Sequence, residues 1–163
     1  DCEDIHLKEN ERDLLTKIFL HIIRNSMDHG IETADERVSK RKNAVGKIWV
    51  EAKLVDGILV IRYKDDGKGL DLKKLREQAD ESRLLTKDEL QDRNKVANII
   101  FQSGISTRTS VTDISGRGVG MGAVKEFLEN SRGSIELKLE ESTEKDDSSV
   151  PFEFHISVPL DLA

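Results

Sequence analysis

The chain has 163 residues, of which 36% are apolar and 36% charged, with a formal net charge of −6. This length predicts a single domain, residues 1–163, built around one hydrophobic core. The acidic balance argues against a general nucleic-acid binder, and no apolar run approaches the roughly 18 residues that a membrane span requires. One cysteine, Cys2, cannot form an internal disulfide, which favours a reducing, cytoplasmic setting. The first residue is Asp1 rather than Met, so we expect a domain excised from a longer protein.

The first part of the chain predicts two helices. Apolar residues recur at helical spacing over residues 9–29, and Gly30 is the expected C-terminal cap. Thr33 and Glu36 form a capping-box pattern, which indicates the start of a short polar helix that reaches about Lys42.

A β-hairpin and a short helix are predicted next. Two apolar-rich runs, 47–55 and 58–64, flank the dipeptide Asp56-Gly57, which is typical of a tight hairpin turn. Residues 71–80 then indicate a short helix.

The following region combines a helix, a long loop and a second helix. Thr86 and Glu89 form another capping box, for a helix that we expect to continue to about Phe101. Residues 102–117 lack apolar periodicity and contain Gly, Ser and Thr throughout, so they predict a long mobile loop, a kind of segment that is often functional. Helical character resumes over residues 118–130.

The last part of the chain predicts two strands, 134–139 and 151–158, on either side of the acidic stretch 140–147. This order of elements indicates an α+β fold, a two-layer α/β sandwich in which helices cover one face of a mixed, mostly antiparallel sheet.

Polar groups occupy one side of the first predicted helix. His21, Arg24, Asn25, Asp28 and His29 fall at helical spacing, where an apolar stripe is usual. An amide oxygen with neighbouring cationic groups suits a Mg²⁺-bound polyphosphate, because Mg²⁺ prefers hard oxygen ligands. Taken alone, however, the stripe is better explained as a polar helix face exposed to solvent.

A second group of candidate residues follows a predicted strand. Asp65 precedes a Gly-x-Gly turn formed by Gly67 and Gly69, which would place a carboxylate at the floor of a cavity. A carboxylate can accept a hydrogen bond from the exocyclic amino group of adenine. Alone, this segment is better explained as an ordinary Asp-Gly turn.

A glycine-rich segment, residues 115–122, leads into the predicted helix 118–130. Glycines allow the backbone to approach phosphate closely, and a helix N-terminus offers unpaired N–H groups. Arg117 and Arg108 would add positive charge. Each of these features is weak alone, but their order along the chain is much more specific.

The ordered set resembles the Bergerat-fold superfamily of ATPases and kinases, which includes gyrase, Hsp90-type chaperones, mismatch-repair ATPases and histidine kinases. It is most similar to the CheA-like catalytic domain of chemotaxis-type histidine kinases. The resemblance covers nearly the whole chain, and the matching strings are HIIRNSMDHGIE (21–32), DDGKGL (65–70), FQSGIST (101–107), SGRGVGM (115–121) and PLDLA (159–163).

The resemblance implies ATP and Mg²⁺ as cofactors and assigns roles to individual residues. Asn25 would ligate Mg²⁺, and Asp65 would bind the adenine amine. His21, Arg24 and His29 would serve the phosphates and the transfer step. The other implied nucleotide-binding residues are Gly67, Gly69, Lys74, Ser106, Arg108, Gly116, Arg117, Gly118 and Gly120.

The chain also departs from the family pattern. Hydrolysing relatives carry Glu where this chain has His21, which favours transfer to an acceptor over rapid hydrolysis. The last glycine box is absent, and Ser148-Ser149-Val150 stands there instead. A lid-side Lys is replaced by Gln78, a Pro by Ser103 and an Asp by Gly122. These departures bear on lid geometry and turnover more than on nucleotide binding.

The function that the resemblance implies is the ATP-binding catalytic domain of a two-component histidine kinase. The acceptor histidine is expected on another domain or chain, because all four histidines lack the acidic residue that usually follows a phosphoacceptor: His6, His21, His29 and His155. Expected partners are that acceptor domain, in cis or in trans, and a downstream response regulator, within a dimeric parent.

No nucleic-acid contact is expected, and no membrane contact by the domain itself, although the parent could be a membrane-anchored sensor. Three alternatives remain: a regulatory nucleotide-binding domain without transfer activity, an ATP-hydrolysing conformational switch, and a structural domain without a ligand.

Overall fold

A single antiparallel sheet organises the chain. The structure, a computed structural model, describes residues 7–102, 120–140 and 147–160. Within them, four strands form one sheet in the order β1-β2-β4-β3, with every neighbouring pair antiparallel. The strands are β1 (Ile48–Val55), β2 (Ile58–Asp65), β3 (Ser134–Leu139) and β4 (Phe152–Pro159). The predicted α+β sandwich is confirmed, although the described sheet contains no parallel pair.

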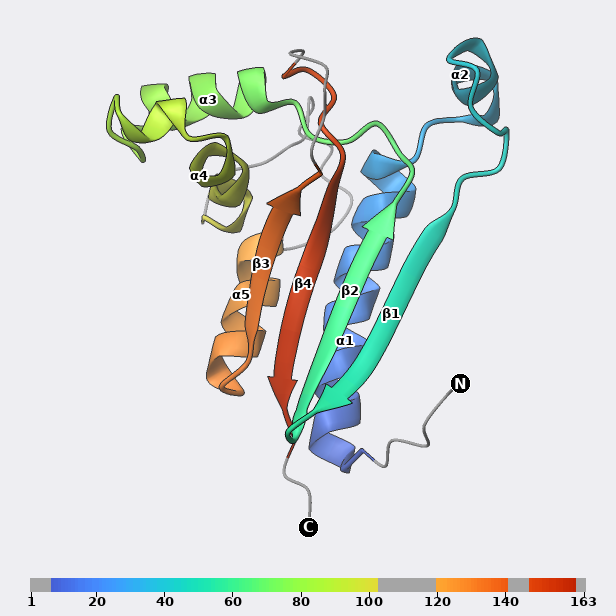
Figure 1. The fold of residues 1–163 in the computed structure, drawn as a ribbon, viewed down its shortest axis with the longest axis vertical. Helices are drawn as coiled ribbons and strands as arrows, with labels where there is room; N and C mark the ends of the chain where they lie inside the picture. The colour runs from blue at the N-terminus through green and yellow to red at the C-terminus, as the bar shows by residue number, and fades with distance from the viewer. Residues whose placement is uncertain (1–6, 103–119, 141–146, 161–163) are drawn as a thin grey trace.

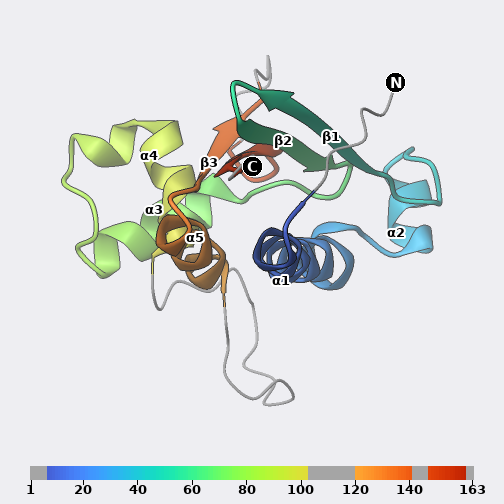
Figure 2. The same ribbon diagram turned by 90° about the horizontal axis from the view of Figure 1, so that it is seen from below.

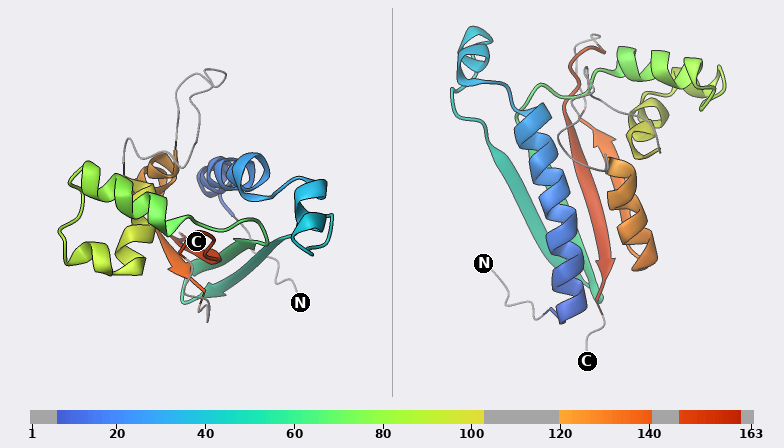
Figure 3. Two further views of the ribbon diagram at one scale, coloured as in Figure 1. Left: turned by 90° about the horizontal axis from the view of Figure 1, so that it is seen from above. Right: turned by 180° about the vertical axis from the view of Figure 1, so that it is seen from behind.

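The helices form the second layer. The long helix α1 (Glu9–Asn25) and α5 (Met121–Asn130) lie side by side behind the sheet and run in opposite directions (Figures 1 and 3). Helices α3 (Leu72–Glu81) and α4 (Arg93–Asn98) gather beyond the β3 edge, and α2 (Ala34–Ser39) stands near the opposite edge (Figure 2). The other face of the sheet carries no helix in the described part of the chain. Helices on one face are therefore as predicted.

The hairpin between β1 and β2 forms as expected. Val55 pairs with Ile58, which leaves Asp56 and Gly57 as a two-residue turn with φ of 50° and 78°. Positive φ at both central positions is the requirement of a type I′ turn, and Asp-Gly meets it at little steric cost.

The first predicted helix changes its geometry where the polar stripe continues. The α-helix ends at Asn25, and Ser26–Gly30 form a π-helical turn in which Ile31 N–H donates to the Ser26 carbonyl oxygen over 2.7 Å. Such π turns often occur at functional sites. The expectation of one regular helix over residues 9–29 is thus wrong for its last turn.

The capping box of α2 is confirmed. Thr33 N–H donates to Glu36 Oε2 over 2.9 Å, and Glu36 N–H donates to Thr33 Oγ1 over 3.4 Å. The helix ends at Ser39, slightly before the predicted end near Lys42.

The predicted helix from Thr86 to Phe101 is divided, which corrects the expectation of one continuous element. The Thr86–Glu89 box forms, but it begins only a short 3₁₀ turn, Glu89–Gln91. Asp92 is extended, with φ of −85° and ψ of 107°, and its side chain accepts hydrogen bonds from the N–H groups at the start of α4. An aspartate that caps a new helix in this way ends the preceding one, because it competes for backbone donors. A second 3₁₀ turn, Ile99–Phe101, follows α4.

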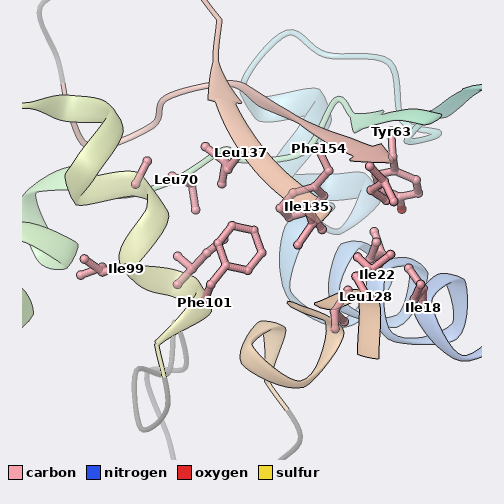
Figure 4. Packing of buried hydrophobic residues seen from close by; sticks show 14 of the residues in the cluster. Ile18, Ile22, Tyr63, Leu70, Ile99, Phe101, Leu128, Ile135, Leu137 and Phe154 are labelled. Carbon is pink, nitrogen blue, oxygen red and sulfur yellow. The ribbon is translucent and has the colours of Figure 1, made fainter. Parts of the chain in front are cut away.

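The core lies between the sheet and the α1–α5 layer (Figure 4). Ile18 and Ile22 of α1 and Leu128 of α5 are fully buried there. Tyr63 and Phe154 face them from β2 and β4, and their rings lie 6.4 Å apart. The described residues include no helix with the length and apolar character needed to cross a membrane.

Candidate active site

The polar stripe of α1 meets the predicted strand-end acid at one end of the sheet. Ser26, which directly follows Asn25, donates a hydrogen bond from its hydroxyl to Asp65 Oδ2 over 2.6 Å. Gly67 N–H donates to the other carboxylate oxygen, Oδ1, over 2.9 Å. Both oxygens of Asp65 are therefore held in place, and each keeps a lone pair that can accept a proton from a ligand.

The two glycines after Asp65 are required by close backbone approach within the protein itself. A Cβ at Gly67 would lie 2.3 Å from the Gly30 carbonyl oxygen, which also accepts a hydrogen bond from Lys68 N–H over 2.9 Å. Gly69 has φ of 71°, and a Cβ there would lie 2.6 Å from the Val150 carbonyl oxygen. This glycine turn thus fixes the position of Asp65 against the end of α1.

The polar stripe also contacts α5. Asn25 Nδ2 donates to the sulfur of Met121, the first residue of α5, over 3.1 Å. One turn earlier on α1, the His21 ring lies against Phe127, with ring centroids 6.2 Å apart. The structure therefore brings the predicted metal ligand, Asn25, to the N-terminus of the helix that follows the glycine-rich segment.

The other predicted site residues are exposed, half-buried or outside the described residues. Arg24 and His29 are exposed at the end of α1 and in the π turn. Lys74 is half-buried on α3. Gly120 is exposed at the N-cap of α5, and no atom of the described residues lies within 4 Å of an added Cβ. The remaining predicted contacts lie outside the described residues: Ser106, Arg108, Gly116, Arg117 and Gly118.

The segment that replaces the last glycine box packs against the first. Leu70 and Val150 form an antiparallel bridge, and Ser149 Oγ donates to the Lys68 carbonyl oxygen over 2.5 Å. Just before this segment, Asp147 accepts a hydrogen bond from Arg76 Nη2 over 2.9 Å. The turn that holds Asp65 is therefore supported from the β4 side without a glycine-rich sequence.

The structure also reveals a buried charged network that the sequence patterns did not predict. Arg37, which is 1% exposed, donates to Glu32 over 3.3 Å and to Asp66 Oδ2 over 2.7 Å. Lys42 donates to Glu32 Oε1 over 2.9 Å and to the Gly67 carbonyl oxygen over 2.8 Å. The network joins the segment between the π turn and β1, which contains α2, to the glycine turn beside Asp65. No local pattern could predict it, because its partners come from separate segments.

This network lowers the pKa of its two carboxyl groups, Glu32 and Asp66. Burial alone would raise the pKa of Glu32, but hydrogen bonds from Lys42, its own backbone and Lys40 outweigh burial and lower this pKa to about 2. Burial opposes ionisation of Asp66 as well, yet the Lys47 backbone and Arg37 hold its pKa below the usual value. Both groups are therefore carboxylates near neutral pH.

A metal ion at this site would depend on few protein ligands. In the described ranges, no three His, Cys, Asp or Glu side chains gather closely enough to hold a metal ion. Mg²⁺ is commonly held by one or two protein oxygens together with phosphate oxygens and water. The half-buried Asn25 fits such a role, because its Nδ2 is engaged by Met121 and its amide oxygen carries no competing charge.

Comparison with known proteins identifies the family. The family model of histidine kinase-, DNA gyrase B- and HSP90-like ATPases matches residues 10–162. The chain is 38% identical to chemotaxis protein CheA of Borreliella burgdorferi over 138 residues, which are 85% of this chain and 16% of that protein. It is 37% identical to CheA of Rhizobium meliloti over 161 residues, 99% of this chain and 20% of the relative.

A third relative is the sensor histidine kinase CheAY of Helicobacter pylori, 43% identical over 124 residues, which cover 74% of this chain and 15% of that protein. The chain thus spans at most about a fifth of the length of these curated relatives. It belongs to the histidine kinase-, DNA gyrase B- and HSP90-like ATPase family, as a CheA-like histidine kinase ATP-binding domain.

Proposed function

We propose that this domain binds Mg²⁺·ATP between the end of α1 and the start of α5, and that it transfers the γ-phosphoryl group to a histidine on another domain or chain. Asp65 would accept a hydrogen bond from the exocyclic amine of adenine, and Asn25 would supply an amide oxygen to Mg²⁺. Membership of an ATPase family supports the binding of ATP itself.

The observation that carries the proposal is the convergence of three separate motifs. Asn25 contacts Met121 at the head of α5, and its neighbour Ser26 bonds to Asp65 at the end of β2. A base held at Asp65 would thus have its phosphates directed towards Asn25 and the N-terminus of α5. The N-cap residue of α5, Gly120, has no side chain that could cap this terminus, and backbone N–H groups at a helix N-terminus are suited to binding an anion.

The proposed reaction requires little covalent participation by the protein. Phosphoryl transfer depends mainly on positioning and on neutralising the charge of the phosphates. Arg24 and His29 lie exposed near Asn25 in the sequence and could approach those phosphates. His21, whose ring lies against Phe127, occupies the position at which hydrolysing relatives carry a glutamate base. Activation of water is therefore not favoured.

We further infer the setting of this activity. The acceptor domain would be supplied in cis or in trans by the parent kinase, and a response regulator would receive the phosphoryl group next. We expect a dimeric parent that is either cytoplasmic or the cytoplasmic part of a membrane-anchored sensor, and the similarity to chemotaxis protein CheA supports a chemotaxis setting.

A second candidate function is a regulatory domain that binds nucleotide without transferring phosphate. The replacement of the last glycine box by Ser148-Ser149-Val150, packed on the first glycine turn, favours this alternative. An ATP-hydrolysing switch, the third candidate, would require another base in place of His21.

One experiment separates these candidates. The purified domain is incubated with [γ-³²P]ATP and Mg²⁺, with and without the phosphoacceptor domain of its parent kinase, and both phosphohistidine and free phosphate are measured. Labelled acceptor with little free phosphate supports the kinase. Binding of ATP without either product supports the regulatory domain, and rapid release of phosphate without labelled acceptor supports the switch.

A further inference from the structure

We propose that Tyr63 is a positioning residue for nucleotide selection, which acts through the hydroxyl of Ser26 on the carboxylate of Asp65. This inference rests on the proposed function, in which Asp65 accepts the exocyclic amine of adenine. The three side chains form a relay from the core to the site.

The relay is continuous and almost fully enclosed at its inner end. Tyr63 Oη donates to Ser26 Oγ over 2.8 Å, and Ser26 Oγ donates to Asp65 Oδ2 over 2.6 Å. Tyr63 is 1% exposed and Ser26 is 5% exposed, whereas Asp65 is half-buried at the site. Tyr63 and Asp65 are two residues apart on β2, so both side chains point to the same face of the sheet.

The direction of each hydrogen bond follows from the chemistry of the groups. An ionised carboxylate can only accept hydrogen bonds, so the Ser26 hydroxyl must donate its single O–H hydrogen bond to Asp65. The oxygen of Ser26 is then left as an acceptor, and Tyr63 supplies the proton that it needs. Burial raises the pKa of Tyr63, which keeps this phenol protonated and able to donate.

The π turn after α1 contributes to this arrangement. Ser26 is its first residue, and the Ser26 carbonyl oxygen accepts the hydrogen bond from Ile31 N–H that closes the turn. The Ser26 backbone is therefore fixed by the turn, while its hydroxyl is fixed by Tyr63. A rotation of the Ser26 side chain away from Asp65 would leave the buried Tyr63 hydroxyl without its partner, which is costly.

The relay affects the ligand through the orientation of the Asp65 carboxylate. Ser26 holds Asp65 Oδ2, and Gly67 N–H holds Oδ1. The plane of the carboxylate is therefore set before a base arrives, so the base does not have to order it. Loss of the Tyr63 hydroxyl would leave the Ser26 side chain freer to rotate. The affinity would then fall only for ligands that hydrogen-bond to Asp65.

The test compares ATP with inosine triphosphate, which carries a carbonyl oxygen in place of the exocyclic amine. Dissociation constants for both nucleotides are measured by calorimetry with Mg²⁺, for the wild-type domain and for Tyr63→Phe. The wild-type domain should prefer ATP. Tyr63→Phe keeps the ring and should weaken ATP binding by about 3- to 10-fold, while inosine triphosphate binding should change by less than about 2-fold because its base lacks the exocyclic amine whose hydrogen bond Asp65 accepts.

Two further variants exclude a purely structural role. Ile61→Val removes one methyl from the same strand and lowers stability mildly without touching the relay, so the preference for ATP should persist. Ser26→Ala should weaken ATP binding at least as much as Tyr63→Phe, and the double variant should equal Ser26→Ala alone, since Tyr63 acts only through Ser26.

The outcomes are distinguishable. Equal weakening of both nucleotides by Tyr63→Phe, or no weakening of either, would overturn the relay while leaving the adenine contact intact. A wild-type domain that binds ATP and inosine triphosphate equally would overturn the adenine contact at Asp65, and the relay with it.

Discussion

Asn25 and Met121 lie 96 residues apart in the sequence, yet the amide nitrogen of Asn25 donates a hydrogen bond to the Met121 sulfur over 3.1 Å. This contact joins the end of α1 to the start of α5, and it engages the nitrogen side of the carboxamide. The oxygen side is then the part of Asn25 that can bind a cation.

Replacement of Asn25 should separate nucleotide binding from phosphoryl transfer. In Asn25→Ala the base contact at Asp65 is untouched, so the variant should still bind ATP measurably. Without its oxygen ligand, Mg²⁺-dependent transfer should fall by roughly 100-fold or more, the effect of removing one preorganised group from such a site. Rates are measured by labelling of the acceptor domain with [γ-³²P]ATP.

Asn130→Ala is the matched control for this variant. Asn130 is exposed at the opposite end of α5 from Met121, so its loss should leave transfer unchanged. Normal transfer by Asn25→Ala would show that the metal ligand has been assigned wrongly.

Asp65→Asn should weaken ATP binding while the fold is retained. The variant keeps the size of the side chain but loses its charge and one of its two acceptor oxygens. The Ser26 hydroxyl and the Gly67 N–H, which both donate to Asp65, would then face an amide with one oxygen and one NH₂ group. The expected loss of binding free energy is about 1–3 kcal/mol, measured by calorimetry.

A control is available in the hairpin turn that precedes the same strand. Asp56 has φ of 50° in the hairpin turn, a conformation that asparagine accepts readily, so Asp56→Asn should change neither stability nor affinity. Unchanged ATP affinity in Asp65→Asn would remove the adenine assignment.

These site residues were predictable to different degrees. Asn25 and Asp65 stand in motifs whose spacing is visible in the sequence, and the capping box at Thr33 and the turn at Asp56 are equally local. The role of Ser26 was not predictable, because a hydroxyl next to Asn25 shows no preference for one distant partner. Only the tertiary fold brings Ser26 to Asp65.

The errors have a similar physical origin. The break at Asp92 is not predictable because the box at Thr86 and the cap at Asp92 both form, and the sequence does not show that the first of them begins only a short 3₁₀ turn. The position of Arg37 was missed because a charged residue on a short polar helix ordinarily faces solvent, whereas here two acidic side chains allow its burial.

The glycines of the site should respond differently to substitution. A Cβ at Gly67 would lie 2.3 Å from the Gly30 carbonyl oxygen, so Gly67→Ala should lower the free energy of unfolding by about 1–3 kcal/mol, through overpacking. Gly120 has φ of −76° and open space beside it, so Gly120→Ala should change this free energy by less than about 0.5 kcal/mol.

The two variants are compared by urea unfolding and by ATP binding. If Gly120 matters because phosphate approaches its backbone, Gly120→Ala should lose affinity without losing stability. Full affinity in Gly120→Ala would count against close approach of the phosphates at the head of α5. Equal stability of Gly67→Ala and the wild-type domain would contradict the close packing of the glycine turn on Gly30.

The Glu32–Arg37 network should make stability depend on acidity below neutral pH. Because the pKa of Glu32 is lowered from 4.5 to about 2 by folding, the unfolded chain binds its proton more readily than the folded one. The stabilisation is therefore fully present above about pH 4.5 and is lost as the pH falls towards 2. A shift of this size corresponds to about 3 kcal/mol, since Glu32 is only 4% exposed and solvent screens it little.

Glu32→Gln isolates this contribution. The variant should be less stable than the wild-type domain at pH 7, where it leaves buried Arg37 with one carboxylate, and the difference should shrink steadily between pH 4.5 and 3. Glu140→Gln is the control, because the Lys64–Glu140 pair is exposed and should contribute less than about 1 kcal/mol. Urea unfolding at pH 7, 5, 4 and 3 gives the comparison. A destabilisation by Glu32→Gln that is the same at pH 3 as at pH 7 would show that its ionisation does not support the glycine turn beside Asp65.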